Sequence, residues 1–197
     1  MWSKYFGLTI EQSIYVKHEF REWHIQGTVD TLKFELNISC ATNELTNKGY
    51  IRKFTIETSA PCKQELGPCF ENVECNIEQI FKVLKAYSDS NKEREIGLDI
   101  CKKEFDSIIT VKKGETLECT VVELGTADTY YFQIKWKLVP SPKHFAKVRN
   151  VCRIACTEDG DKYIKTNTDL ASIKKRLSHF PIEVIKLLAR GIADSGK

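Results

Sequence analysis

The chain has 197 residues, of which 42% are hydrophobic and 29% are charged. This length allows one large domain or two small ones, and the composition excludes a wholly disordered chain. The first residues lack the continuous apolar segment of a secretory signal, and no apolar stretch approaches the ~20 residues that cross a bilayer. We therefore expect an intracellular protein, cytoplasmic or nuclear, with no membrane partner.

Eight cysteines are present, and in an intracellular protein we expect them to be free thiols. Cys40 continues the apolar alternation of the segment before it, where a small side chain packs well. The alternative is an extracellular fragment in which Cys62, Cys69 and Cys75 could form disulfides and Asn37 could be glycosylated.

Three segments in the first third of the chain alternate apolar and polar residues, the pattern of half-buried strands. In residues 13–20 the apolar face holds Ile14, Val16, His18 and Phe20. In residues 31–40 it holds Leu32, Phe34, Leu36 and Ile38. A third strand over residues 50–56 follows a polar turn, and the solvated second face predicts an antiparallel hairpin with its predecessor.

A loop and a helix are predicted next. Residues 59–75 contain Pro61, Gly67 and Pro68 without a sustained period, so we expect a long loop. Asn76 is suited to cap a helix, and apolar residues then recur at helical spacing through residues 76–87. The polar run at residues 88–93 is expected to end that helix.

Strand patterns return in the middle of the chain. The predicted strands lie at residues 96–100, 107–111, 116–124 and 129–139. The last has an apolar face of Tyr130, Phe132, Ile134, Trp136 and Leu138, opposite Tyr131, Gln133, Lys135 and Lys137. A short loop from Gly125 joins the last two strands and predicts a hairpin. Pro140 and Pro142 are expected to end the sheet, because proline cannot donate to a strand ladder.

The C-terminal part differs in character. We expect a short hairpin over residues 151–164, followed by two helices. The first covers residues 169–179 and is capped by Asn167 or Thr168. The second begins at Pro181, a residue favoured at the first helical position, and carries an apolar stripe.

Together these elements predict a β-rich α+β fold: an antiparallel sandwich or strongly bent sheet with one covering helix and a C-terminal helical pair. Residues 1–139 form the β-rich domain, which includes the helix near residues 76–87; the alternative is two β modules divided near residues 88–93. Residues 140–197 form a basic element with two helices, packed on the same domain. We find no internal repeat, and no residue pattern identifies a known family.

Positive charge is concentrated in the C-terminal part. Residues 140–197 contain twelve Lys or Arg and six Asp or Glu, a net +6, so residues 1–139 carry −3 to give the total of +3. Such a surface attracts phosphates, although solvated lysine-rich helix faces are the common alternative. The candidate partner or nucleic-acid binding residues are Lys143, Lys147, Arg149, Arg153, Lys174, Lys175 and Arg176, with Tyr131, Lys135 and Lys137 as an aromatic flanked by cations.

Catalytic and metal-binding motifs are absent from the sequence. It contains no phosphate-binding lysine loop, nucleophile elbow or zinc-protease helix. Cys152 and Cys156 lie four residues apart with no second pair nearby, which favours packing over zinc. We predict a non-catalytic protein without a cofactor: a protein-interaction module or subunit of an intracellular complex, whose partner is another protein. The alternative is an RNA- or DNA-binding protein that uses the basic C-terminal surface.

Overall fold

The computed structural model describes residues 7–17, 21–43, 45–46, 48–59, 62–70, 76–113, 118–126, 129–141, 144–161 and 170–195. The chain divides into two compact units, Met1–Asp89 with Pro140–Val148, and Ser90–Val139 with Arg149–Lys197. Its strands form two antiparallel four-stranded sheets, so the predicted strand-rich α+β class is confirmed. The sandwich arrangement stays a prediction. None of the described helices has both the length and the apolar character needed to span a membrane.

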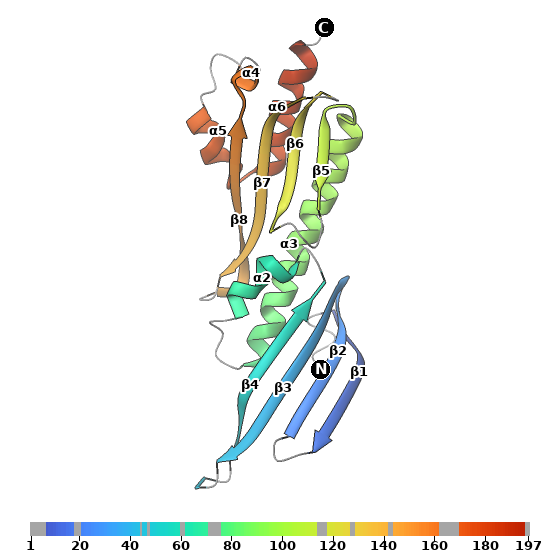
Figure 1. Ribbon diagram of the computed structural model, residues 1–197, viewed down its shortest axis with the longest axis vertical. Helices are drawn as coiled ribbons and strands as arrows, with labels where there is room; N and C mark the ends of the chain where they lie inside the picture. Colours follow the sequence, from blue (N-terminus) through green and yellow to red (C-terminus); the bar gives the residue numbers. More distant parts are fainter. Residues whose placement is uncertain are drawn as a thin grey trace. The chain divides into compact units, whose positions relative to one another are not determined.

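The first sheet is a simple meander at the start of the chain (Figure 1). Its strands are β1 (Leu8–Lys17), β2 (Arg21–Val29), β3 (Leu32–Asn43) and β4 (Lys48–Thr58), paired in that order. The face predicted for β3 is confirmed, because Leu32, Phe34, Leu36 and Ile38 are all buried. The predicted antiparallel pairing of β3 with β4 is confirmed as well.

The face predicted for β1 is wrong. Leu8 is buried, whereas Ile14 is 46% exposed and lies opposite His24. A register shift between Ile10 and Gln12 explains the difference, because one extra residue exchanges the two faces of a strand. His18 and Phe20, predicted for the same face, lie outside the described residues.

Two helices cover part of the first sheet: α2 (Cys62–Phe70) and the first half of α3 (Ile77–Glu104). Phe81 of α3 packs edge to face against Phe34, with ring centroids 5.7 Å apart. The Tyr87 hydroxyl donates to the buried Glu65 carboxylate of α2, and the Ser88 hydroxyl donates to the Val29 carbonyl oxygen at 3.3 Å. Polar groups of both helices are thus satisfied inside the first unit.

The helix α2 corrects the loop predicted for residues 59–75. Gly67 and Pro68 are unfavourable in helices and dominated the prediction. Leu66 and Cys69, three residues apart on one helical face, are 1% and 7% exposed. Burial of that face against the first unit stabilises a helix that its own residues disfavour.

The helix α3 corrects two further predictions. Its start is as expected, since the Asn76 side chain accepts hydrogen bonds from the backbone N–H groups of Glu78 and Gln79 at 3.0 and 3.3 Å. It continues through the polar run to Glu104, however, and the strand predicted at residues 96–100 is wrong. The buried positions of its second half are Arg94, Leu98 and Cys101, at helical spacing, while Ile96 and Ile100 are about half exposed.

Arg94 explains why the sequence pattern did not predict the second half of α3. It occupies a position of the buried stripe, where it is 1% exposed. Its guanidinium donates to the Trp136 carbonyl at 3.4 Å and the Asn91 side-chain oxygen at 2.7 Å, and lies 5.9 Å from the Trp136 ring centroid. A charged residue therefore fills a place at which the periodic pattern predicts an apolar one.

The second sheet repeats the meander. Its strands are β5 (Ile109–Lys112), β6 (Thr120–Thr126), β7 (Thr129–Ser141) and β8 (His144–Cys156), in chain order. The predicted hairpin of β6 and β7 is confirmed. Two expectations are wrong: Pro140 and Pro142 do not end the sheet, since β8 follows as its fourth strand, and residues 151–156 belong to that single strand rather than to a hairpin. Pro140 lies in β7 beyond Trp136, the last residue of that strand with a described partner on β6, so its missing N–H removes no hydrogen bond from that pairing.

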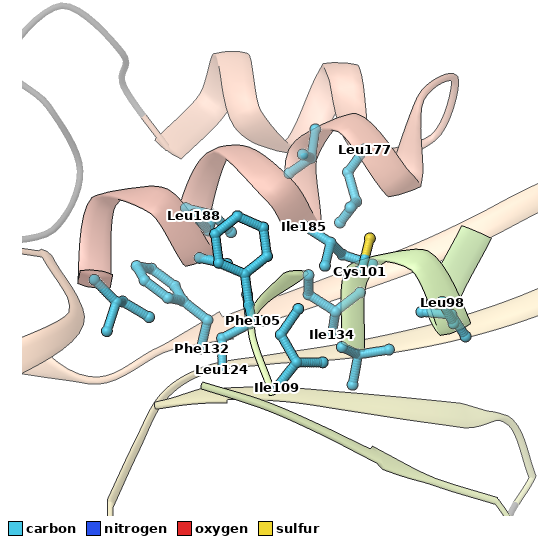
Figure 2. Packing of buried hydrophobic residues seen from close by; sticks show 14 of the residues in the cluster. Leu98, Cys101, Phe105, Ile109, Leu124, Phe132, Ile134, Leu177, Ile185 and Leu188 are labelled. Carbon is cyan, nitrogen blue, oxygen red and sulfur yellow. The ribbon is translucent and has the colours of Figure 1, made fainter. Parts of the chain in front are cut away.

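Helices cover one face of this sheet. The short α4 (Glu158–Asp161) precedes the predicted C-terminal pair, α5 (Leu170–Leu177) and α6 (Pro181–Ser195), which is confirmed. Figure 2 shows the resulting core, in which strand residues such as Leu124, Phe132 and Ile134 pack with Leu177 and Ile185. Gly97 of α3 permits close helix packing, because a Cβ there would lie 2.6 Å from Ile182 Cγ1.

Candidate protein-interaction surfaces

Most of the basic residues predicted from the sequence lie on two opposite faces of the second unit. Alternation along β7 buries Phe132, Ile134, Trp136 and Leu138 toward the helices. Lys135 and Lys137 therefore project from the other face, which we call the outer face. On β8 the exposed residues Arg149, Val151 and Arg153 alternate with Cys152 and Ile154, which pack against the core.

A hollow of about 520 Å³ lies on this outer face. Cys119, just before β6, and Val121 of β6 form its apolar floor, since both line it and are 5% and 7% exposed. The other lining residues include Lys135, Lys137, Val151 and Arg153. Val121 is paired directly with Lys135 in the strand register, so an aliphatic surface and a cation stand side by side. We call this site the basic hollow.

Carboxylates accompany some of these cations. The Lys137 ammonium lies 3.1 Å from a carboxylate oxygen of Glu118, and its hydrogen bond holds the pKa of Glu118 below the usual range. On the same face, the hydrogen bond from Lys112, at 2.6 Å, lowers the pKa of Glu123. Within the part of the chain that the structure describes, Lys135 and Arg153 form no ion pair. Their charges remain available to a ligand.

Tyr131 does not join the basic hollow. The register between β6 and β7 shifts at Gly125, leaving Tyr131 as the extra residue of a bulge. It is partly buried against the core, and its carbonyl oxygen accepts a hydrogen bond from the Thr157 N–H at 2.9 Å. The same bulge explains why Tyr130, predicted for the apolar face, is 45% exposed.

The remaining basic candidates lie elsewhere. Lys174, Lys175 and Arg176 are exposed on α5, which belongs to the helical layer on the opposite face of the sheet because its Ile173 and Leu177 are in the core. Arg176 is 3.9 Å from the carboxylate of Glu183. The last two candidates are Lys147, exposed on β8, and Lys143, outside the described residues.

A second surface, which the sequence did not indicate, lies at one end of the first sheet. A hollow of about 340 Å³ is lined there by Arg21, Trp23, Cys40, Gly49, Tyr50 and Ile51. Trp23 is 40% exposed and Tyr50 is 52% exposed. We call this site the aromatic hollow.

The aromatic hollow continues the buried face of the first sheet. Trp23 is paired with Ile38 in the register, and Cys40 follows Ile38 by two residues, so all three lie on one face. Burial is complete at Leu36, is 95% at Ile38 and becomes partial at Cys40. In Figure 1 the ends of β3 and β4 extend past α2 and α3. The apolar face thus continues beyond its described helical cover.

Cations gather at the same end of the first sheet. Arg21 lines the hollow, and Lys48, Arg52 and Lys53 are exposed at the start of β4. Lys48 and Lys53 are paired with Asn43 and Ser39, out of phase with the Cys40–Ile51 pair that lines the hollow, so they lie on the opposite face of the sheet. Among the described lining residues, Arg21 is the cation beside the apolar surface.

Cys152 and Cys156 pack against the hydrophobic core and do not form a reactive site. Burial raises the pKa of Cys152 and of Cys156 to about 12. Both side chains face the core from β8, and the Cys156 thiol donates to the Asp161 carboxylate at 3.3 Å. Because the thiolate is the form that attacks substrates or binds zinc, neither thiol is prepared for that chemistry at neutral pH.

Comparison with known proteins does not assign this chain to a group: no protein-family model matches its sequence, and no curated protein matches it significantly. We therefore infer function from the residues that line the basic hollow and the aromatic hollow.

Proposed function

We propose that this chain is a non-catalytic protein-interaction module of a complex, and that a partner protein docks in the aromatic hollow. The observation that carries the proposal is the exposure of Trp23 beside Arg21 and Ile51 in one apolar depression, whose lining also includes Tyr50. Trp, Tyr and Arg are the residue types most enriched at energetic centres of protein interfaces. Their side chains offer large contact areas at a small cost in conformational entropy.

The proposed occupant is a segment of another protein with an apolar anchor and neighbouring carboxylates. The apolar anchor fills the space between Trp23 and Ile51, and a carboxylate faces the Arg21 guanidinium. Arg21 in the lining favours an acidic segment over a basic one, because complementary charge accelerates encounter and rejects like-charged partners.

An intracellular place of action is part of the proposal. The described cysteines Cys40, Cys69, Cys101, Cys119, Cys152 and Cys156 are all free thiols. Thiols persist in the reducing cytosol and nucleus, whereas exported proteins of this cysteine content usually form disulfides.

The nucleic-acid alternative receives less support. Most of its described candidate residues are divided between two faces of the second unit, and Lys147 lies in the first unit, which separates the positive charge. Tyr131 packs against the core instead of offering a ring to a base.

The direct test is affinity purification of the full chain from cells with quantitative mass spectrometry. It compares the natural chain with a Trp23→Ala/Tyr50→Ala variant. The matched control is Tyr130→Ala/Phe180→Ala, which removes two aromatic side chains of similar exposure, 45% and 54%, in the second unit. Thermal unfolding checks that both variants remain folded.

We expect partners that are retained by the control and depleted at least about tenfold with the Trp23→Ala/Tyr50→Ala variant, the effect of losing roughly 1.4 kcal/mol or more of binding free energy. Arg21→Glu should weaken the same partners, whereas Lys33→Glu, an exposed charge reversal elsewhere on the first sheet, should not. Identical protein sets from the natural chain and the Trp23→Ala/Tyr50→Ala variant would contradict the proposal. Sedimentation velocity measures whether a second copy of this chain is the occupant instead.

A further inference from the structure

The basic hollow of the second unit has the construction of a separate binding site. Its floor is apolar, formed by Cys119 and Val121, and Val151 adds an aliphatic wall that is 39% exposed. Its volume of about 520 Å³ falls within the range of roughly 300–1,000 Å³ that ligand sites span. An aliphatic side chain fits this floor, because filling it removes apolar surface from water.

Cations stand around the floor. Lys135, Lys137 and Arg153 all line the hollow, and Arg149 lies two residues before Val151 on the exposed side of β8. Among the described lining residues one carboxylate, that of Glu118, is present, and it is already bonded to Lys137. The charges of Lys135 and Arg153 therefore determine what the hollow attracts, and they favour carboxylates or phosphates.

The apolar floor of the hollow favours a peptide that carries carboxylates over a nucleic acid that carries phosphates. A nucleic-acid backbone carries phosphates but has no aliphatic group to place on Val121 and Val151, and the lining offers no aromatic ring for a base. A peptide can present carboxylates and an aliphatic side chain on alternate positions of one extended segment. Both properties of the hollow are then used at once.

We propose that the basic hollow binds an acidic peptide segment of a partner protein, with an aliphatic side chain on the Val121 and Val151 floor and carboxylates facing Lys135 and Arg153. This site lies in a different unit from the aromatic hollow and does not depend on the function proposed for it. The chain would then engage partners through two surfaces, each within one unit.

A phage-displayed library of random peptides, selected on the purified full chain, provides the test. Enriched peptides are then measured by fluorescence anisotropy against the natural chain and a Lys135→Glu/Arg153→Glu variant. The matched control is Lys174→Glu/Lys175→Glu, which makes the same charge change on the opposite face of the same unit. Labelled single-stranded DNA and RNA are titrated in parallel, at roughly 50 and 200 mM salt.

The proposal predicts enriched peptides that combine Asp or Glu with Leu, Ile or Val. Their affinity should fall at least about tenfold in Lys135→Glu/Arg153→Glu and stay within about twofold in the control. A conservative Val121→Ala/Val151→Ala variant, which keeps every charge, should also weaken binding and so reports on the apolar floor.

Three results would overturn the proposal: no enrichment, enriched peptides without acidic residues, or equal loss of affinity in the Lys135→Glu/Arg153→Glu variant and the control. Saturable oligonucleotide binding lost only in Lys135→Glu/Arg153→Glu would assign the hollow to nucleic acid instead. A peptide that binds the aromatic hollow should keep its affinity in Lys135→Glu/Arg153→Glu, because that variant changes only residues that line the basic hollow, so the two sites can be told apart.

Discussion

The two units are built on the same meander but differ in how their helices cover it. In the second unit, Phe132, Ile134 and Leu124 are fully buried by α3, α5 and α6. In the first unit, the corresponding apolar face begins fully buried at Leu36 and ends at Trp23, which is 40% exposed. A strand pattern predicts which residues share a face, but the length of the covering helices decides which of them are buried in the core and which stay exposed.

The largest expected change in the free energy of unfolding comes from truncating a buried aromatic residue, and we compare it with truncation of an exposed one in the other sheet. Phe132→Ala removes a fully buried ring and should lower the free energy of unfolding by about 3–5 kcal/mol. Trp23→Ala removes a ring that is already 40% exposed and should cost clearly less. Urea denaturation of both variants measures the two values, and equal losses would show that the end of the first sheet is core rather than an available surface.

The helical packing of the second unit is tested at Gly97. Gly97→Ala places a methyl group 2.6 Å from Ile182 Cγ1 and should destabilise the fold by about 1–3 kcal/mol, although alanine is the better helix former. Ile182→Ala should relieve part of this cost in the double variant. A stabilised Gly97→Ala variant would show that α3 and α6 do not pack this closely.

The helical cover of the first unit is tested at Tyr87. Tyr87→Phe removes the donor to the buried Glu65 carboxylate that joins α3 to α2. The loss should be about 1–3 kcal/mol in the free energy of unfolding, because a buried acceptor keeps its desolvation cost without its partner. Leu66→Ala provides a purely apolar comparison on α2, and an unchanged unfolding midpoint in Tyr87→Phe would mean that this contact does not hold α2 in place.

The smallest expected effect concerns the rim of the basic hollow. The hydrogen bond from Lys137 lowers the pKa of Glu118 below its ordinary value, so this pair stabilises the fold above that value and loses its contribution as the pH falls through the lowered pKa. Lys137→Met should raise the Glu118 pKa toward the ordinary value, as measured by NMR titration. Stability should change little, because the pair is solvent-exposed. An unchanged pKa would show that the pair does not form in solution.

The same comparison shows which strands and helices could be predicted from the sequence and which could not. Period-two alternation was sufficient for the face of β3 and for the hairpin of β6 and β7, since it depends only on neighbours along the chain. The second half of α3 was missed because Arg94 fills a core position, and α2 was missed because Gly67 and Pro68 disfavour a helix that tertiary burial stabilises.

The candidate surfaces were less accessible to prediction. Lys135, Lys137 and Arg153 were identified from charge, but their separation from Lys174 and Lys175 depends on which face of the sheet the helices cover. Trp23 was not identified from the sequence, because alternation does not tell where the helical cover of a strand ends. The surface predicted for Tyr131 was wrong, because the alternation pattern does not show the bulge that shifts the register at Gly125.

The central claim is that the aromatic hollow is a docking surface for another protein. Its most direct test replaces Trp23 with a photoreactive phenylalanine analogue in the full chain, irradiates cells and identifies the crosslinked products. The account predicts a discrete crosslinked protein at position 23 that is lost when Arg21 is changed to Glu, and that is absent when the same analogue replaces the equally exposed Tyr130. No product at position 23, or the same products at both positions, would contradict it.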